Sequence, residues 1–295
     1  MHRRCAVLCY ALPRQDLCYV PKPRSVCCLG ALCMYIAQSW TPQPTRPTAQ
    51  ARRGLRWAPF VSLFLAVAAW HALSAQYPPF ILPSPALVLM RAWQKLLDGT
   101  LLAHVLVTLA EALLGLAMGS VMALLIGVPM AKSALAERLL APFVVASQGI
   151  PFVAVAPLIF IWFGNGTFAK ALVCALVVFF PMTINIMVGV RSAPAVLHAL
   201  FRMMQATPWE TLVKLELPAA LPFVFAGLRV SVTLSMVGAI AGEFLSASRG
   251  LGFLVSLGSG TYDTPLVMVS VLVTIALTLS LYGSVRLAER LVLRS

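Results

Sequence analysis

Six hydrophobic stretches, separated by short polar segments, follow one another from Leu55 to the end of the chain. A helix needs roughly 20 consecutive apolar residues to cross a bilayer, and each stretch is close to that length. The pattern therefore predicts an all-α, polytopic membrane protein with about six transmembrane helices. The predicted spans cover approximately residues 57–75, 106–130, 139–163, 168–190, 223–245 and 266–287.

The basic residues between these spans are concentrated in alternate loops. They precede the first span, separate the second from the third and the fourth from the fifth, and follow the sixth. Lys and Arg accumulate on the cytoplasmic side of membrane proteins. We therefore expect both termini and the segment 191–222 to be cytoplasmic. The residues are Arg52, Arg53, Arg56, Lys132, Arg138, Arg191, Arg202, Lys214, Arg286, Arg290 and Arg294.

The segment 202–222 is polar and rich in proline, yet it lies between two apolar spans. Its charged residues would be costly in hydrocarbon, so their presence indicates contact with something in water. We expect a short helix over residues 206–214, with Thr207 as its N-cap and Pro208 in its first turn. Trp209 is then an aromatic anchor for a partner. An amphipathic helix lying on the inner membrane surface is the alternative.

A second proline-rich segment, residues 77–85, follows the first span. Ser84 is a suitable N-cap and Pro85 a suitable first helical residue, which predicts a helix over 86–97. This helix is expected to lie on the outer surface of the membrane. A loop packed on the spans is equally compatible with the pattern.

Three residues inside the spans are candidates for a pathway or gate. Pro151, with Pro157, is expected to bend the third span beside Gln148, which suits a translocation pathway or plain structural kinking. Glu243 lies near the outer end of the fifth span, where we expect water to reach it, and has either a packing role or a gating role. Together with Glu111 it supplies too few partners for a proton relay, which makes a proton-coupled carrier the weaker transport hypothesis.

Composition agrees with a membrane protein. Hydrophobic residues make up 60% of the chain and charged residues 11%, and the mean hydropathy is +0.91. The formal net charge of +13 is divided between the first 54 residues and single positions at span ends. The chain therefore lacks the basic stripe of a nucleic-acid-binding protein.

Residues 1–54 differ in composition from the predicted membrane domain, residues 55–295. They contain six of the seven cysteines, without the paired spacing of a metal site, and a stretch rich in Pro, Thr and Gln. We expect a disordered tail or sequence upstream of the true start. A redox or metal-binding extension is the alternative.

Catalytic motifs are missing from the sequence. The nearest approach to a phosphate-binding loop, residues 127–133, lacks the glycine before Lys132. Ser259 has Leu257 where an intramembrane serine protease needs glycine, and no histidine follows His198. The four histidines show no metal-ligand spacing. We therefore expect no catalytic residue, metal or cofactor on this chain.

Residues 57–290 resemble the permease subunits of binding-protein-dependent ABC importers, the MetI-like family with the type I fold. The similarity is greatest to the branch for nitrate, sulfonate, taurine and thiamine precursors. Several short stretches carry the resemblance in this order: Pro79-Phe-Ile-Leu-Pro-Ser-Pro85, Ile150-Pro-Phe-Val-Ala-Val-Ala-Pro-Leu158, Trp162-Phe-Gly-Asn-Gly166, Ala206-Thr-Pro-Trp209, Leu217-Pro-Ala-Ala-Leu-Pro222, Ala226-Gly-Leu-Arg229, Ala241-Gly-Glu-Phe244 and Gly250-Leu-Gly252.

The resemblance implies a function in the bacterial inner membrane. Two permease copies, expected to be identical, form the pathway for a small organic solute, either pyrimidine-like or sulfonate- or nitrate-like. A cytoplasmic ATPase binds ATP and Mg, and a periplasmic or lipid-anchored binding protein delivers the solute. A polytopic membrane enzyme or a scaffold subunit is the alternative. The residues implied to couple the permease to the ATPase are Gln205, Ala206, Thr207, Pro208, Trp209, Glu210, Lys214, Leu217 and Pro218.

The chain departs from the family pattern in this coupling loop, residues 191–222. Family members begin the loop with Glu-Ala-Ala, where this chain has Ala199-Leu-Phe201, and place a glycine where this chain has Gln205. Gln tolerates helical geometry better than Gly. We therefore expect the glycine turn to be absent, with coupling elements that join differently or a divergent ATPase.

Overall fold

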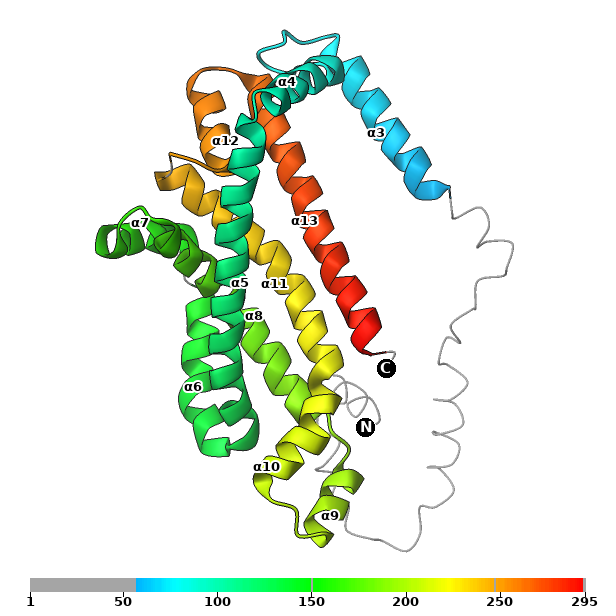
Figure 1. The fold of residues 1–295 in the computed structure, drawn as a ribbon, viewed down its shortest axis with the longest axis vertical. Helices are drawn as coiled ribbons and strands as arrows, with labels where there is room; N and C mark the ends of the chain where they lie inside the picture. Colours follow the sequence, from blue (N-terminus) through cyan, green and yellow to red (C-terminus); the bar gives the residue numbers. More distant parts are fainter. Residues whose placement is uncertain (1–56, 150, 247, 294–295) are drawn as a thin grey trace, which may run out of the picture. The chain divides into compact units, whose positions relative to one another are not determined.

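A computed structural model of the chain describes residues 57–149, 151–246 and 248–293 (Figure 1). These residues form helices joined by loops, without a strand in the described part. Residues 1–62 and 63–295 are separate units, and the described part of the first is only the start of α3. The predicted tail, residues 1–54, lies outside the described residues. The helices are α3 (Ala58–Ser74), α4 (Pro85–Leu97), α5 (Thr100–Lys132), α6 (Ala134–Gln148), α7 (Phe152–Phe163), α8 (Thr167–Arg191), α9 (Ala195–Met203), α10 (Pro208–Thr211), the π-helix η1 (Leu212–Glu216), α11 (Leu217–Ser246), α12 (Leu251–Gly260) and α13 (Thr264–Val292).

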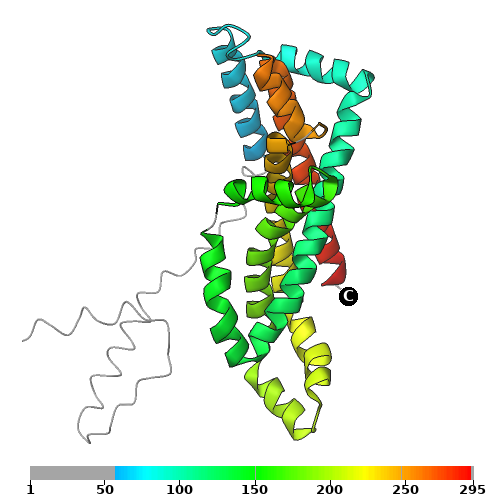
Figure 2. The ribbon, with the colours of Figure 1, turned by 90° about the vertical axis from the view of Figure 1, so that its left-hand side faces the viewer.

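Helices α5, α8 and α11 form the centre of the second unit. Two clusters of buried side chains join all three, one around Ala123, Ile186 and Ala220 and another around Cys174 and Met236. Helices α4 and α12 lie at one end of these three helices, and α9 and α10 lie at the other end (Figures 1 and 2).

Small residues let α5 and α8 approach closely. A Cβ atom built on Gly119 would lie 2.7 Å from the carbonyl oxygen of Ala175, and one on Gly127 would lie 3.1 Å from that of Thr183. Apolar burial gives little drive for association between helices in lipid, so close backbone packing has to hold them. The small residues at Gly115 and Gly119, which the sequence shows at a four-residue interval, lie on this contact.

Among the described residues, four helices are long and apolar enough to cross a membrane: α5, α8, α13 and the continuous helix Pro208–Leu245. The third predicted span is instead two helices, α6 and α7, whose axes differ by 100°. The bend predicted beside Gln148 is therefore confirmed, but Pro157 lies inside α7 and does not break it. The first predicted span is a shorter apolar helix.

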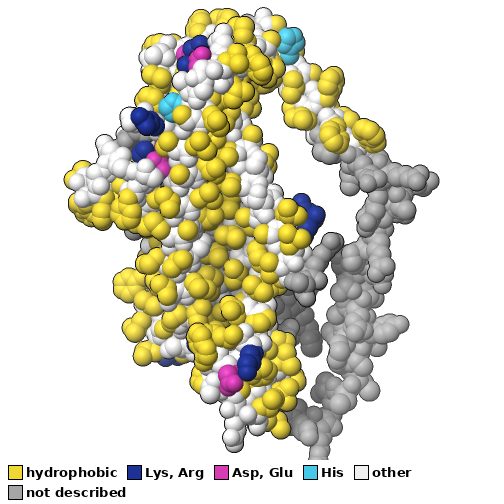
Figure 3. Space-filling model, in the orientation of Figure 1, with side chains coloured by type: hydrophobic (Ala, Val, Ile, Leu, Met, Phe, Trp, Pro, Cys, Tyr) yellow, Lys and Arg dark blue, Asp and Glu magenta, His cyan; other side chains and the backbone are white. Residues whose placement is uncertain are grey.

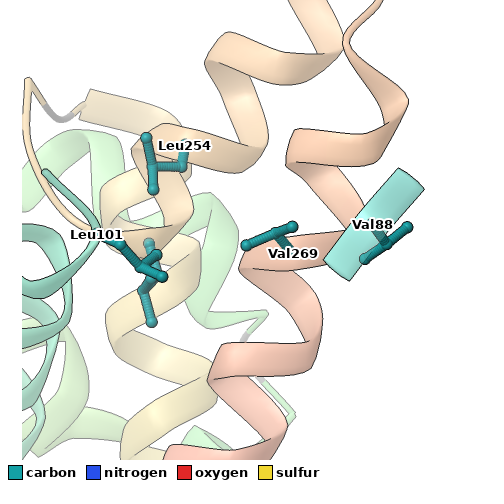
Figure 4. Packing of buried hydrophobic residues seen from close by; sticks show 5 residues of the cluster. Val88, Leu101, Leu254 and Val269 are labelled. Atoms are coloured by element: carbon teal, nitrogen blue, oxygen red, sulfur yellow. The ribbon is translucent and has the colours of Figure 1, made fainter. Parts of the chain in front are cut away.

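The helix predicted after the proline-rich segment is α4. The hydroxyl of Ser84 accepts a hydrogen bond from the Leu87 N–H at 3.4 Å, and Pro85 opens the helix, as predicted. Val88 of α4 packs in a cluster with Leu101, Leu254 and Val269 (Figure 4). Arg91 of α4 also pairs with Asp263, which caps α13. These contacts fix α4 across the ends of α5, α12 and α13.

An ion pair joins three helices near the opposite end. The Arg191 guanidinium donates to both carboxylate oxygens of Glu137, at 2.9 and 2.8 Å. It also donates to the carbonyl oxygens of Met130 and Ala131 at 2.8 and 3.1 Å. The last residue of α8 thereby holds the end of α5 and the start of α6 together.

Hydrophobic side chains cover most of the coloured face in Figure 3, and charged side chains are few. The exposed residues include many large apolar ones, such as Phe143, Ile161 and Leu279. A surface of this kind is suited to lipid rather than water.

Candidate functional site

The coupling loop predicted from the sequence folds as a helical hairpin. Helix α9 ends at Met203, and α10 begins at Pro208. The Thr207 hydroxyl accepts a hydrogen bond from the Glu210 N–H at 3.2 Å, and the Glu210 carboxylate accepts one from the Thr207 N–H at 2.9 Å. This reciprocal capping box stabilises the first turn of a helix too short to be stable alone. The predicted roles of Thr207 as N-cap and Pro208 as a first-turn residue are confirmed.

Gln205 corrects one expectation from the sequence. Its φ angle is 53°, in the left-handed region, so the chain makes a left-handed turn at this position although glycine is absent. The reason is geometric: the chain must leave α9 and start α10 within a few residues, and a left-handed residue after a helix end achieves that reversal. Ala206, between Gln205 and the cap, is half-buried.

The first turns of α10 and η1 present an exposed polar and aromatic surface. Trp209 is 70% exposed. Lys214 and Glu210, one helical turn apart, form an ion pair at 3.2 Å. Hydrogen bonds from the backbone and hydroxyl of Thr207, followed by the Lys214 ammonium, lower the pKa of Glu210 to about 2. The Glu210 carboxylate is therefore ionised at neutral pH, which keeps both the cap and the ion pair in place.

The coupling loop continues without interruption into α11. The π-helix η1 leads directly to Leu217 and Pro218, which open α11 and are both exposed. All nine predicted coupling residues thus lie on one continuous stretch of backbone. Sequence reasoning missed Glu216, which is buried at the end of η1 and pairs with Lys132 of α5. The available signal in the sequence was an acidic residue directly before Leu217-Pro218.

Of the three residues predicted as a pathway or gate, Gln148 and Pro151 lie at the bend between α6 and α7, whereas Glu243 belongs to α11. Gln148, at the end of α6, is exposed and lines a cavity of about 260 Å³ with Phe152 and Pro181. Pro151 is the N-cap residue of α7. Glu243 lies elsewhere, in α11, and is 1% exposed. The expectation that water reaches Glu243 is wrong, because α5 and α12 cover it.

Glu243 holds the start of α12. One carboxylate oxygen accepts a hydrogen bond from the Thr108 hydroxyl and the other from the Gly252 N–H, each at 2.7 Å. The Thr108 hydroxyl in turn accepts from the Leu251 N–H at 2.9 Å. Nδ1 of His104 accepts from the Gly250 N–H, also at 2.9 Å. Side chains of α5 and α11 therefore satisfy the free N–H groups at the N-terminus of α12.

A second carboxylate lies in the same region. Glu111 of α5 is fully buried and pairs with Lys170 of α8, Nζ to Oε1, at 3.0 Å. Lys170 was not identified from the sequence as a partner, although a lysine inside an apolar segment is a signal for a buried pair. The three buried charges tie α5 to α8 and α11 to α12. In the described part of the chain, no group of three His, Cys, Asp or Glu side chains is placed to hold a metal ion.

Comparisons with known proteins agree with this architecture. Residues 115–294 match the protein family described as "Binding-protein-dependent transport system inner membrane component". The riboflavin transport system permease protein RibX of Chloroflexus aurantiacus is 44% identical over 236 residues, 79% of this chain and 88% of that protein. The formylaminopyrimidine transport permease protein ThiX of Halalkalibacterium halodurans is 34% identical over 215 residues, 73% of this chain and 86% of that protein.

A solved structure supports the fold. The MetNI methionine ABC transporter in an inward-facing conformation matches with a TM-score of 0.59 and 20% identity, covering 66% of this chain and 97% of that one. The predicted all-α, type I permease fold is thereby confirmed. The chain belongs to the family of binding-protein-dependent transport system inner membrane components and is a permease subunit of an ABC importer, with the ATPase on a separate subunit.

Proposed function

We propose that this permease carries a planar heteroaromatic vitamin or vitamin precursor, with riboflavin as the first candidate. The observation that carries the proposal is the 44% identity to a riboflavin permease over most of both chains. Identity to the aliphatic sulfonate and taurine permeases is lower, at 29–31%. The sequence left two solute classes open, pyrimidine-like and sulfonate- or nitrate-like, and the proposal takes the first of them.

A cavity on the permease is suited to such a solute. It has a volume of about 780 Å³ and lies beside α11 and α13. Phe152, Phe244 and Met236 supply apolar and aromatic walls, and the lining residues with polar side chains are Thr233, Thr274 and Thr278. Its lining residues include no Lys or Arg, which a site for a sulfonate or nitrate anion would need.

Uptake into vesicles tests the solute. The permease is reconstituted with its ATPase and binding protein, and ATP-dependent accumulation of labelled riboflavin, formylaminopyrimidine and taurine is measured. We expect ATP-driven accumulation of riboflavin or, as the second candidate, of formylaminopyrimidine. ATP-driven uptake of taurine in preference to both would overturn the proposal.

We propose further that α10 is the helix that docks on the cytoplasmic ATPase, with Gln205 to Lys214 at the interface and Leu217 and Pro218 leading into the membrane. In this arrangement two permease copies enclose the pathway, and closure of the ATPases on ATP rotates the spans. A periplasmic or lipid-anchored binding protein delivers the solute to the other side. The exposure of Trp209 supports the proposal, because an aromatic side chain on a rigid short helix is a typical interface anchor.

Truncation of this anchor tests the docking. Removing a buried aromatic anchor typically costs about 2 kcal/mol or more of binding energy, whereas an exposed ion pair contributes little. Trp209→Ala is therefore expected to lose most of the ATPase on co-purification, and Glu210→Ala to retain it. Full co-purification and normal ATPase stimulation in Trp209→Ala would favour a helix lying on the membrane surface instead.

We also propose that Glu243, Gln148 and Pro151 act on the pathway at separate points. Glu243 is proposed to hold α12 across the outer end of α5 and α11. Pro151 and Gln148 are proposed to form the bend where α6 meets α7. The burial of Glu243 and the break between α6 and α7 support these roles.

A further inference from the structure

The junction between the coupling helix and the span has an unusual backbone. Residues 208–245 form one continuous helix, but its second turn, η1, is a π-helix. Such turns are rare, and they are often found at functional positions inside α-helices. A π-turn is also a place where a helix can change its direction. Along the backbone, movement of α10 therefore reaches α11 through η1.

A buried carboxylate marks the end of this π-turn. The Glu216 side chain is 9% exposed. One of its oxygens lies 3.2 Å from Nζ of Lys132, the last residue of α5, and the other lies 3.4 Å from Nε2 of His198 in α9. A buried carboxylate is costly unless it is paired, and these two side chains supply the pairing. We call Glu216, Lys132 and His198 the Glu216 bridge.

Lys132 has a second contact that makes the bridge more than a local pair. Its ammonium donates a hydrogen bond to the carbonyl oxygen of Pro208, the first residue of α10, at 3.1 Å. The end of α5 therefore holds both the start of α10 and the end of η1. Removing Lys132 would delete both of these links to α5.

The bridge also has room to move. It borders a cavity of about 600 Å³ whose lining includes Lys132, His198, Pro208 and Glu216. Close-packed interiors resist displacement, whereas polar contacts at the edge of a cavity can shift without forcing neighbours apart. The arrangement combines a specific link between elements with space for their displacement.

We propose that the Glu216 bridge transmits movement between the coupling helix and α5, and that Glu216 and Lys132 are positioning residues for coupling. The proposal rests on the proposed role of α10 at the ATPase. With the bridge intact, α5 and α11 respond to α10 together. Without it, the π-turn absorbs the displacement, so the ATPase still docks but no longer responds to events at the outer face.

The test uses the full complex in lipid vesicles, with the cognate binding protein supplied together with riboflavin. Two quantities are measured: the amount of ATPase that co-purifies, and the factor by which the binding protein stimulates ATP hydrolysis. For Glu216→Gln we expect normal co-purification and a stimulation factor reduced by about 5-fold or more, the lower end of typical coupling between sites. Lys132→Met should reduce the stimulation factor in the same way, whereas Lys132→Arg should retain most of the wild-type stimulation.

A double mutant separates coupling from general destabilisation. Lys132→Met already removes the pair with Glu216, so the double variant should be no worse than Lys132→Met alone. Two independent losses of stability would add instead. The matched control is Glu137→Gln, the same isosteric change in an ion pair near the same ends of the helices, on α6. It should leave stimulation at the wild-type level.

The outcomes distinguish this proposal from the docking proposal. If Trp209→Ala releases the ATPase while Glu216→Gln and Lys132→Met are stimulated normally, the bridge proposal is wrong and the docking proposal stands. If Glu216→Gln also releases the ATPase, Glu216 is needed for ATPase binding and the bridge proposal is again wrong. If Trp209→Ala releases nothing, the docking proposal fails. If Glu216→Gln assembles poorly, the stimulation factors of Lys132→Met and Lys132→Arg are compared instead. Equal factors in these two variants would overturn the bridge proposal.

Discussion

Gln205 occupies a backbone conformation that favours glycine. A side chain in the left-handed region costs roughly 1–2 kcal/mol, which exceeds the entropy that glycine loses on folding. Gln205→Gly is therefore expected to stabilise the loop by about 1 kcal/mol and to raise the melting temperature of the purified permease in detergent. Met204→Gly is the control, because its φ of −78° gains nothing from glycine. A fall in melting temperature for both variants would contradict the strain at Gln205.

Gly250 also depends on having no side chain. Its φ is +115°, and a Cβ atom there would collide with the Glu243 carboxylate. Gly250→Ala is expected to lower stability by roughly 1–3 kcal/mol, the usual cost of forcing extra atoms into a packed site. Gly260→Ala, at the other end of α12 with no atom within 4 Å of the added Cβ, should change little. Thermal unfolding measured by intrinsic fluorescence compares the two, and equal melting temperatures would argue against the packed site.

The sequence predicts single residues where the cause is local. Thr207 and Ser84 were identifiable as caps because a cap bonds to an N–H three residues away. Lys170 with Glu111, and Lys132 with Glu216, are far apart along the chain, and only the packing of α5, α8 and α11 brings them together. The expectation at Gln205 failed because glycine favours a left-handed turn but is not required for one.

Helix packing yields a prediction with opposite signs at two glycines. A Cβ on Gly119 of α5 would lie 2.7 Å from a backbone oxygen of α8, whereas one on Gly283 of α13 meets no atom within 4 Å. Gly119→Ala should therefore destabilise the permease by about 1–3 kcal/mol. Gly283→Ala should stabilise it by up to about 1 kcal/mol through helix propensity. Melting temperatures that shift in the same direction would refute this assignment of the α5–α8 contact.

The sequence predicted four long apolar helices and the two short helices with a proline and an N-cap, α4 and α10, but it did not predict α12. Apolar length identifies α5, α8, α11 and α13, because a membrane span imposes it. Helix α12 is ten residues long and rich in glycine, and its stability comes from contacts with α5 and α11 rather than from its own sequence. The proline pattern located the bend after α6, but not its angle.

At the scale of the whole molecule, the charge pattern predicts the direction of insertion. Gly166, between α7 and α8, is expected to face outward, and Thr211 in α10 to face the cytoplasm. Gly166→Cys, in a background without native cysteines, should react with an impermeant maleimide in intact cells. Thr211→Cys should react only after permeabilisation. Labelling of both sites from outside would invalidate the topology and the docking surface together.

The fastening of α5 to α11 at both ends has a mechanical consequence. At one end Thr108 of α5 bonds to Glu243 of α11, and at the other Lys132 of α5 pairs with Glu216, one residue before α11. Two helices that are linked at both ends cannot separate at either end without breaking one of the links. The two helices would therefore move as one rigid body. A displacement of α10 would tilt α5 and α11 together, and this tilt would reach α12.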